Sequence, residues 1–315
     1  MSIGTVDRAL NNRPGINQKT KERIQSVSRE IGYHPHLVAR SLKTGRTSTV
    51  GIVVYDLDNR FFAQLVNAIE SVARESGYFI YLTLSHHDLS REKECLEHLA
   101  SLNVDGVLIV PTNKGGEFIR FVKSLPVPVV AIGNRISPTI PFVGLQDKEA
   151  IRSAVGVIAG RGYTRVIYVS PPLSYGQREN IYEVEERYAG FRAGVQEHSL
   201  QSGVIRDKHF QEALQEAIKG DSARTAIMCS SDIYALECLR LLGSWGMRVP
   251  EDVGLLGFDD IDFLKYIRPA LTTISYPTAE IAHEAFRILK ELMAGATGTC
   301  LARLIEPKLI VRESL

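Results

Sequence analysis

The sequence predicts an α/β protein of two doubly wound parallel-sheet halves, preceded by a small all-α segment. From residue 49 onward, continuous apolar runs alternate with helical patterns, giving one strand and one helix about every 25 residues. Strands that are apolar on both faces and alternate with helices are typical of a buried parallel sheet. Before residue 49 the pattern is helical and strongly basic, so we expect a separate small unit there.

The N-terminal segment is predicted to hold three short helices. The breaker cluster at 11–15 ends the first helix, and Asn17 occupies an N-cap position before the second, which Gly32 stops. A third helical stretch covers residues 36–43. Helices this short need tertiary or ligand support. Apolar stripes at helical spacing define the first two: Ile3, Val6 and Leu10, then Thr20, Ile24, Val27 and Ile31.

The remainder of the chain contains two consecutive series of strands. We expect the first series at 50–55, 78–84, 104–110 and 128–132, with helices at 61–76, 91–102 and 116–125. The second series is expected at 165–169, 226–229, 253–258, 271–275 and 304–311, with helices at 148–160, 187–197, 232–246 and 279–294. Two doubly wound halves in sequence place a cleft at the carboxyl ends of their strands.

Composition excludes several classes of protein. At 44% hydrophobic and 23% charged residues the chain is ordinary for a globular protein. No run approaches the roughly 18 apolar residues that a membrane span needs. Charge near the N-terminus, where a signal peptide has its apolar stretch, indicates a cytoplasmic protein. The four cysteines show no Cys-x-x-Cys pairing, so we interpret them as reduced thiols: Cys95, Cys229, Cys238 and Cys300.

Motifs for catalysis, metals and cofactors are absent from the sequence. It has no Gly-x-Gly-x-x-Gly, Walker, Gly-x-Ser-x-Gly or His-Glu-x-x-His motif, and no cofactor or metal is predicted. The run 85–88, Ser-His-His-Asp, admits a metal or catalytic interpretation, but a solvated loop after a strand is the favoured one. An enzyme on this fold is therefore the weakest hypothesis.

Charge is distributed unevenly along the chain. Residues 1–49 contain nine Lys or Arg and three Asp or Glu, a net charge of +6, whereas the whole chain carries +1. A small basic segment on a mildly acidic body indicates a polyanion partner for that segment alone. A solvated charged face is the alternative, and composition does not decide between them.

Six segments in register resemble the LacI (lactose-repressor) family of transcription regulators. Residues 2–16 resemble the recognition helix of this family and the approach to its next helix. Residues 32–42 resemble its hinge, and residues 56–62 resemble the start of its effector-binding core. Its C-terminal signature is matched at 249–253 (Val-Pro-Glu-Asp-Val), 257–261 (Gly-Phe-Asp-Asp-Ile) and 269–274 (Pro-Ala-Leu-Thr-Thr-Ile). The resemblance covers nearly the whole chain and implies two halves of the periplasmic-binding-protein-like type I fold behind a helix-turn-helix headpiece.

The resemblance implies how the N-terminal segment meets operator DNA. Arg8 would contact guanine in the major groove, and Ile3 and Gly4 occupy positions that vary to choose bases. Leu42 would wedge into a minor-groove step with Ala39 alongside; a core leucine is the alternative. Phosphate contacts would come from Thr5, Asn11, Asn17 and Thr20.

Three departures from the family bear on DNA binding. Asp7 stands where the family usually has Ser, and His36 replaces a hinge Asn that would cap the helix better. The first helix of the headpiece is absent, so the helix-turn-helix is truncated and the chain opens inside its turn. We therefore expect a reading frame that begins upstream, and weak, strongly salt-dependent and sequence-indifferent binding of the 315-residue form to DNA.

The resemblance also implies an effector site between the halves. Arg187 and Asp259 would face one another across the interdomain cleft and bind sugar hydroxyls, with Phe61 or Phe62 lining it. Tyr276 stands at a position where the family has Gln, and Ser231 stands at a position where the family usually has Asn. The full set of expected ligand-binding residues is Asn59, Phe61, Phe62, Asn134, Arg135, Arg187, Ser231, Asp259 and Tyr276.

Charge near the expected cleft favours an acidic ligand only weakly. Arg60 stands where the family often has Pro, and Arg178 lies in the segment 174–182, which is longer than the family norm. Both would attract a sugar acid if they point inward. Surface-exposed arginines are the more common interpretation.

We therefore predict a DNA-binding regulator, most simply a repressor, that a small sugar, sugar acid or other sugar derivative switches. A homodimer is expected because no room remains for a tetramer-forming tail. A sugar-binding protein of the periplasmic type without a DNA-binding role is the alternative. The expected domains are a headpiece at 1–33, a hinge at 34–48, an N-terminal effector subdomain at 49–146 and 276–300, and a C-terminal effector subdomain at 147–275 and 301–315.

Overall fold

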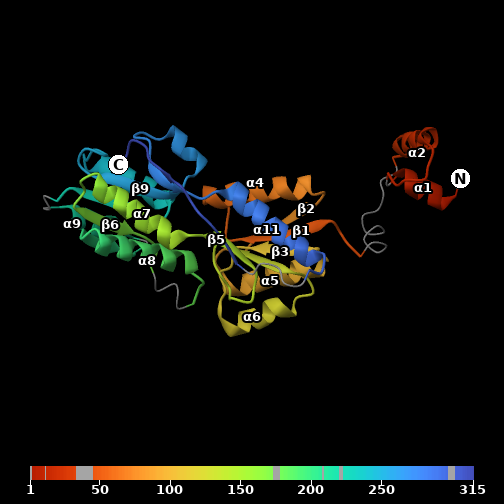
Figure 1. Cartoon of the computed structure of the whole chain (residues 1–315), viewed down its shortest axis with the longest axis horizontal. Coiled ribbons are helices and arrows are strands. Elements are labelled where there is room, and N and C mark those ends of the chain that lie inside the picture. Colours follow the sequence, from red (N-terminus) through yellow and green to blue (C-terminus); the bar gives the residue numbers. More distant parts are fainter. Residues whose placement is uncertain are drawn as a thin grey trace. The chain divides into compact units, whose positions relative to one another are not determined.

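The computed structural model describes residues 2–10, 12–32, 45–172, 178–207, 209–219, 223–296 and 302–315 (Figure 1). The chain divides into two compact units, a head at 1–47 and a body at 48–315. Several expectations concern residues outside this description: Asn11, His36, Ala39, Leu42, residues 174–177 and Cys300. Of Ile3 only the backbone is described.

Two helices make up the described part of the head. Helix α1 spans Ile3–Leu10 and α2 spans Gln18–Glu30. The side chain of Asn17 caps α2 by accepting a hydrogen bond from the Lys19 amide at 2.9 Å, as the sequence predicted. Ala9 and Ile24 are buried, whereas Val27 and Ile31 are 46% and 69% exposed. The apolar stripes of α1 and α2 therefore leave an open groove along the head.

The first half of the body is an entirely parallel six-stranded sheet. Its strand order is β11-β5-β4-β3-β1-β2. The strands are β1 (Thr49–Val54), β2 (Phe79–Leu84), β3 (Gly106–Ile109), β4 (Val129–Ile132), β5 (Phe142–Leu145) and β11 (Ala302–Ile305). Its helices are α4 (Arg60–Glu75), α5 (Leu89–Ser101), α6 (Gly115–Ser124) and α11 (Thr278–Met293).

Helices cover both faces of this first sheet (Figure 1). Helices α4 and α11 lie along one face, and their apolar residues join one buried cluster with the side chains of that face. Helices α5 and α6 pack on the other face through Leu96, Leu99, Phe118 and Val122. A sheet buried on both sides explains why its strands read as continuous apolar runs.

The second half is a six-stranded sheet with one antiparallel edge. Its order is β12-β10-β9-β8-β6-β7, and only the β10–β12 pairing is antiparallel. The strands are β6 (Arg165–Val169), β7 (Gln201–Ile205), β8 (Thr225–Cys229), β9 (Gly254–Asp259), β10 (Thr272–Ser275) and β12 (Leu309–Ile310). Its helices are α7 (Asp147–Gly160), α8 (Tyr182–Glu197), α9 (Gln211–Ile218), α10 (Asp232–Ser244) and the 3-10 helix η2 (Asp262–Tyr266).

The C-terminal segment corrects one expectation. We expected a single strand at 304–311 and placed 301–315 wholly in the second half, but β11 pairs with β5 of the first sheet and β12 with β10 of the second. Pro307 lies between the two strands and has no N–H to donate, so one continuous ladder is interrupted there. Strands β5 and β7 and helix α9 were also missed, because their short segments carry weak patterns.

Neither a membrane-spanning helix nor a cluster of metal-binding side chains occurs among the described residues. Within these ranges no helix is both long and apolar enough to cross a bilayer. The same residues contain no cluster of three or more His, Cys, Asp or Glu side chains suited to a metal ion. Cys95, Cys229 and Cys238 are free thiols.

Candidate ligand-binding site

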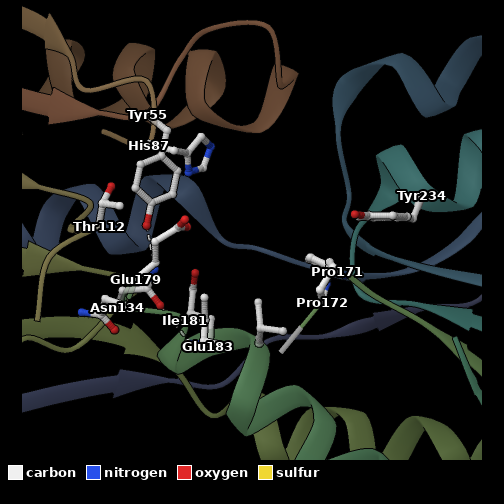
Figure 2. A pocket seen from close by; sticks show the side chains of 12 residues that line it. Tyr55, His87, Thr112, Asn134, Pro171, Pro172, Glu179, Ile181, Glu183 and Tyr234 are labelled. Carbon is white, nitrogen blue, oxygen red and sulfur yellow. Dashed lines mark hydrogen bonds between the residues drawn. The ribbon is translucent and has the colours of Figure 1, made fainter. Parts of the chain in front are cut away.

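A cavity of about 560 Å³ lies between the two halves of the body, within the usual size range of small-molecule sites. The residues that line it mostly follow the carboxyl ends of parallel strands: Tyr55 comes after β1, His87 after β2, Asn134 after β4 and Pro171 after β6. Figure 2 shows Tyr55 and His87 on one side and Glu179, Ile181 and Glu183 on the other. The complete lining is Tyr55, His87, Thr112, Asn134, Pro171, Pro172, Glu179, Asn180, Ile181, Glu183, Val184 and Tyr234.

Tyr55 and Asn134 form a hydrogen-bonded wall on the first half. The Tyr55 hydroxyl donates to the Pro111 carbonyl oxygen at 3.0 Å and accepts from the Asn134 amide nitrogen at 2.7 Å. The Asn134 oxygen in turn accepts a hydrogen bond from the backbone N–H of Glu183 at 3.0 Å, which joins the two halves. Burial, followed by the charge of Glu183, raises the pKa of the Tyr55 hydroxyl well above its usual value. Tyr55 therefore acts as a neutral hydrogen-bonding group.

His87 lines the cavity from the solvated loop that the sequence predicts at 85–88, where the side chains of residues 86–88 are exposed. Its ring packs on Tyr55 with 4.2 Å between ring centroids, and its Nε2 lies 3.7 Å from an Asp56 carboxylate oxygen. His86 and His87 both have positive φ, 51° and 58°. The position of His87 directly after a strand of a parallel sheet was the signal that could have identified it.

Asn180 makes further contacts between the halves. Its backbone N–H donates to the Thr112 carbonyl oxygen at 2.7 Å, and its side chain donates to the Arg135 carbonyl oxygen at 3.1 Å. The Thr112 loop is itself held by the buried Glu92 of α5, whose carboxylate accepts the backbone N–H of Asn113 at 3.0 Å. Sequence reasoning did not identify these residues, since each acts through a partner distant in the chain.

Arg187 is the centre of a buried charge cluster. Its Nε donates to Asp147 at 2.7 Å, one terminal nitrogen donates to the Ser230 carbonyl oxygen at 2.8 Å, and the other lies 3.7 Å from Glu183. The guanidinium also lies over the Phe258 ring, 3.6 Å from its centroid. Such fork geometry and stacking are characteristic of arginine and unavailable to lysine.

Asp259 belongs to this cluster, but not as we expected. Arg187 on α8 and Asp259 at the end of β9 both belong to the second half, so they do not face one another across the cleft. They are near enough that the charge of Arg187 lowers the pKa of Asp259, although burial, the larger effect, raises it well above its usual value. The assignment of residues 147–275 to the second half already placed both side chains there, so only their position across the cleft from one another was wrong.

Three carboxylates therefore share one guanidinium: Asp147, Glu183 and Asp259. Burial raises the pKa of Glu183 to about 7; Arg187 opposes this rise and Asp147 adds to it. Burial likewise raises the pKa of Asp147, with Arg187 opposing it. Burial therefore makes each of these three carboxyl groups hold its proton more readily than a free carboxyl group does.

The turn that carries Asp259 is held by another buried acid. Asp259 and Asp260 have φ of 116° and 55°, which are strained values for residues with a Cβ. The Asp232 carboxylate accepts the backbone N–H of Ile261 at 3.0 Å and the Thr273 hydroxyl at 2.7 Å. These bonds fix the turn after β9, and burial raises the pKa of Asp232 to about 7.

The remaining residues of the expected site do not line the cavity. Phe61 and Phe62 are buried; Phe61 packs edge-on against Tyr276 with ring centroids 4.5 Å apart, and Phe62 against Tyr55 at 5.2 Å. The Asn59 side chain caps α4 by accepting the Phe61 N–H at 3.1 Å. Of the nine expected residues, only Asn134 is among the lining residues described above. Arg135 is half-buried next to Asn134, and Ser231 is half-buried at the start of α10.

The arginines that favoured an acidic ligand do not enter the cavity. Arg60 forms two hydrogen bonds to Asp262, and its charge is matched there. Arg178 is exposed and is not among the described lining residues. That argument for a sugar acid therefore loses its support.

Comparison with known proteins agrees with this architecture. The model for bacterial regulatory proteins of the lacI family matches residues 1–36, and the model for a periplasmic binding protein-like domain matches residues 155–315. The regulator RegA of Clostridium acetobutylicum is 30% identical over 320 residues, covering 100% of this chain and 96% of that protein. The repressor CytR of Escherichia coli K12 is 28% identical, with 100% and 93% covered.

Solved structures have the same fold. A periplasmic binding protein/LacI transcriptional regulator from Alkaliphilus metalliredigens, complexed with D-xylulofuranose, is 26% identical with a TM-score of 0.75, covering 85% of this chain and 98% of that one. The Lac repressor bound to ONPG is 22% identical with a TM-score of 0.86, covering 100% and 96%. The fold and site define a helix-turn-helix regulator with a periplasmic-binding-protein-like body. The chain belongs to the lacI family of bacterial regulatory proteins.

Proposed function

We propose that this chain is a transcription repressor whose head binds operator DNA and whose affinity for that DNA is switched by a small sugar or sugar derivative in the cavity. The observation that carries the proposal is the presence, in one chain, of a lacI-type head and a cavity of suitable size between two α/β halves. Relatives of matching length are named as transcription regulators and repressors. One similar structure holds a pentulose.

The head supplies the chemistry for DNA. On α1, Gly4 and Arg8 are exposed, which leaves the Arg8 guanidinium accessible to a base edge. Asp7, the acid that departs from the family pattern, forms an ion pair with Arg13 at 3.3 Å. This pairing reduces the repulsion that a lone acid would exert on phosphate. The basic charge of the segment supplies the non-specific part of the affinity.

The body supplies a switch. The two halves contact one another through separate polar interactions, including Asn134 with Glu183 and Arg60 with Asp262. A ligand that contacts both walls of the cavity favours one arrangement of the halves over others. It can shift the equilibrium only by its difference in affinity for those arrangements.

A homodimer completes the proposal. Edge strand β2 exposes Phe79 by 74% and Tyr81 by 46%, an apolar surface suited to an isologous contact with a second copy. We expect Phe79→Glu to shift the sedimentation coefficient from dimer to monomer, whereas Phe263→Glu at another exposed aromatic leaves it unchanged. Equal dimer fractions for both variants would exclude β2 as the interface.

DNA selection followed by binding measurements tests the main proposal. Enrichment of one sequence from a random pool by the full chain, with protection of that sequence in footprinting, would support the proposal and overturn the weak, sequence-indifferent binding expected from the sequence. Arg8→Ala should lower affinity for that sequence about 5- to 150-fold, the worth of a bidentate contact to guanine, while reducing binding to random DNA much less. Absence of any binding to DNA at low salt, combined with intact sugar binding, would favour a sugar-binding protein without a DNA-binding role.

A further inference from the structure

We propose that the effector carries a protonated amino group, so that it is an amino sugar or a sugar derivative with an alkylammonium group. This inference rests on the proposed function and names the ligand class for its cavity. The observation behind it is the charge of the lining: the described residues include the carboxylates of Glu179 and Glu183 and the imidazole of His87, but no Lys or Arg.

Two arginines near the cavity already have partners, whereas the Nε of Arg135, next to the lining residue Asn134, is buried without one among the described residues. Arg187 is bound to Asp147 and to the Ser230 carbonyl oxygen and is stacked on Phe258. Arg60 is bound to Asp262. Three carboxyl groups, those of Asp147, Glu183 and Asp259, lie beside the single guanidinium of Arg187, and burial raises the pKa of each. An anionic group on the ligand would raise these pKa values further, whereas an ammonium group would favour the charged form of the carboxyls.

Glu183 is placed to receive such a group. Its backbone is fixed by the hydrogen bond to Asn134. Its Oε1 lies 3.7 Å from a terminal nitrogen of Arg187 and is buried without a hydrogen bond of its own among the described residues. The Thr112 Oγ1, another lining group, is also buried and has no partner there. Buried polar atoms without partners are costly, and an ammonium group brings three donors that can satisfy acceptors of this kind.

The opposite side of the cavity is suited to the body of a sugar. Figure 2 places the Tyr55 and His87 rings across from Glu179 and Glu183, with Tyr234 at a separate position on the lining. Aromatic faces pack on apolar C–H surfaces, and the Asn134 amide can hydrogen-bond hydroxyls. The field of the carboxylates reaches this wall, since Glu183, Glu92 and Glu179 all raise the pKa of Tyr55 in addition to its burial.

Titration calorimetry on the full chain tests the inference with matched sets of ligands. Each set contains an amino sugar, its parent and its N-acetyl form: glucosamine, glucose and N-acetylglucosamine, with the corresponding galactose and mannose sets. At pH 7 and low salt we expect the amine of at least one set to bind at least about tenfold more tightly than its two neutral counterparts. The advantage should shrink as salt increases.

Variants locate the effect. Glu183→Gln should abolish the preference for the amine without weakening binding of the neutral parent, whereas Glu185→Gln, at an exposed position of the same helix, should change neither. Because the wild-type comparison needs no variant, a folding defect in Glu183→Gln leaves the test intact. The inference is overturned if the neutral parent sugars bind as tightly as the corresponding amino sugars. It is also overturned if none of the amino sugars binds. The proposed function is judged separately by the DNA selection and Arg8→Ala.

Discussion

Arg60 at the start of α4 and Asp262 in η2 are joined by two hydrogen bonds, of 2.8 and 2.6 Å, across the boundary between the halves of the body. Gln64, one turn further along α4, accepts the backbone N–H of Asp262 at 2.9 Å, and the Arg60 guanidinium lies 5.4 Å from the Phe263 ring centroid. We call this set of contacts the polar latch. At the position of Arg60 the family often has Pro. It is one of the contacts that a conformational switch must keep or break.

The latch should be detectable as coupling between its two members. We expect Arg60→Ala and Asp262→Ala each to lower the Tm of the body by a few degrees at most, since partly exposed ion pairs contribute little. The Tm of the double variant should fall no further than the Tm of the single variant with the larger decrease. Differential scanning calorimetry at low and high salt measures this, with Arg74→Ala, on the same helix beside Glu70, as the control. Strict additivity of the two losses would argue against a latch.

Removing the Arg187 guanidinium should destabilise the body strongly. Arg187→Leu leaves Asp147, Glu183 and Asp259 buried without their cation, and breaking a buried pair in this way typically costs about 3–5 kcal/mol. Urea unfolding measures the loss, and the exposed Arg192→Ala on the same helix serves as control. Adding Asp147→Asn to Arg187→Leu should recover part of the loss. A loss below about 1 kcal/mol would mean that the cluster relaxes or is hydrated.

Stability should fall as pH rises toward neutrality. The pKa of Glu183 is 4.5 in an unperturbed chain and about 7 in the folded protein, because of burial. Between these values the folded state holds a proton that the unfolded state has released, so the free energy of unfolding decreases with increasing pH across this window and levels off above it.

The buried Asp232 contributes in the same direction, with a folded pKa of about 7. We expect Glu183→Gln, and separately Asp232→Asn, to flatten the decline measured by urea unfolding between pH 4.5 and 7. Glu185→Gln, at an exposed position, should leave the profile unchanged. A wild-type profile that rises through this window would contradict the assignment.

Two glycine substitutions in helices should have opposite effects. A Cβ at Gly190 of α8 would lie 2.2 Å from the Lys148 backbone oxygen of α7, so Gly190→Ala must push the two helices apart and should cost about 1–3 kcal/mol or more. A Cβ at Gly243 of α10 meets no atom within 4 Å, and Gly243→Ala should stabilise the body by about 0.4–1 kcal/mol. Thermal unfolding of both variants measures the contrast. A neutral Gly190→Ala would disprove the close packing of α7 on α8.

The sequence by itself determined the family, the basic head with its capped second helix, and the order of most strands and helices of two doubly wound halves. These features depend on local signals: apolar periodicity, N-caps, breakers and motifs that can be read within a few residues. The carboxyl ends of parallel strands also indicated in advance where a cavity would form, and Asn134 lies there.

Only the tertiary structure decided how charged side chains pair and which of them face the cavity. Arg187 and Asp259 lie close together within one half, Arg60 pairs with Asp262, and Glu183 lines the cavity, although no local pattern distinguishes these positions. Each of these side chains has several polar or charged residues near it in the sequence with which it could have paired. The choice among them depends on packing between segments up to about 200 residues apart, such as Arg60 and Asp262, and on which charges must be neutralised when they leave water.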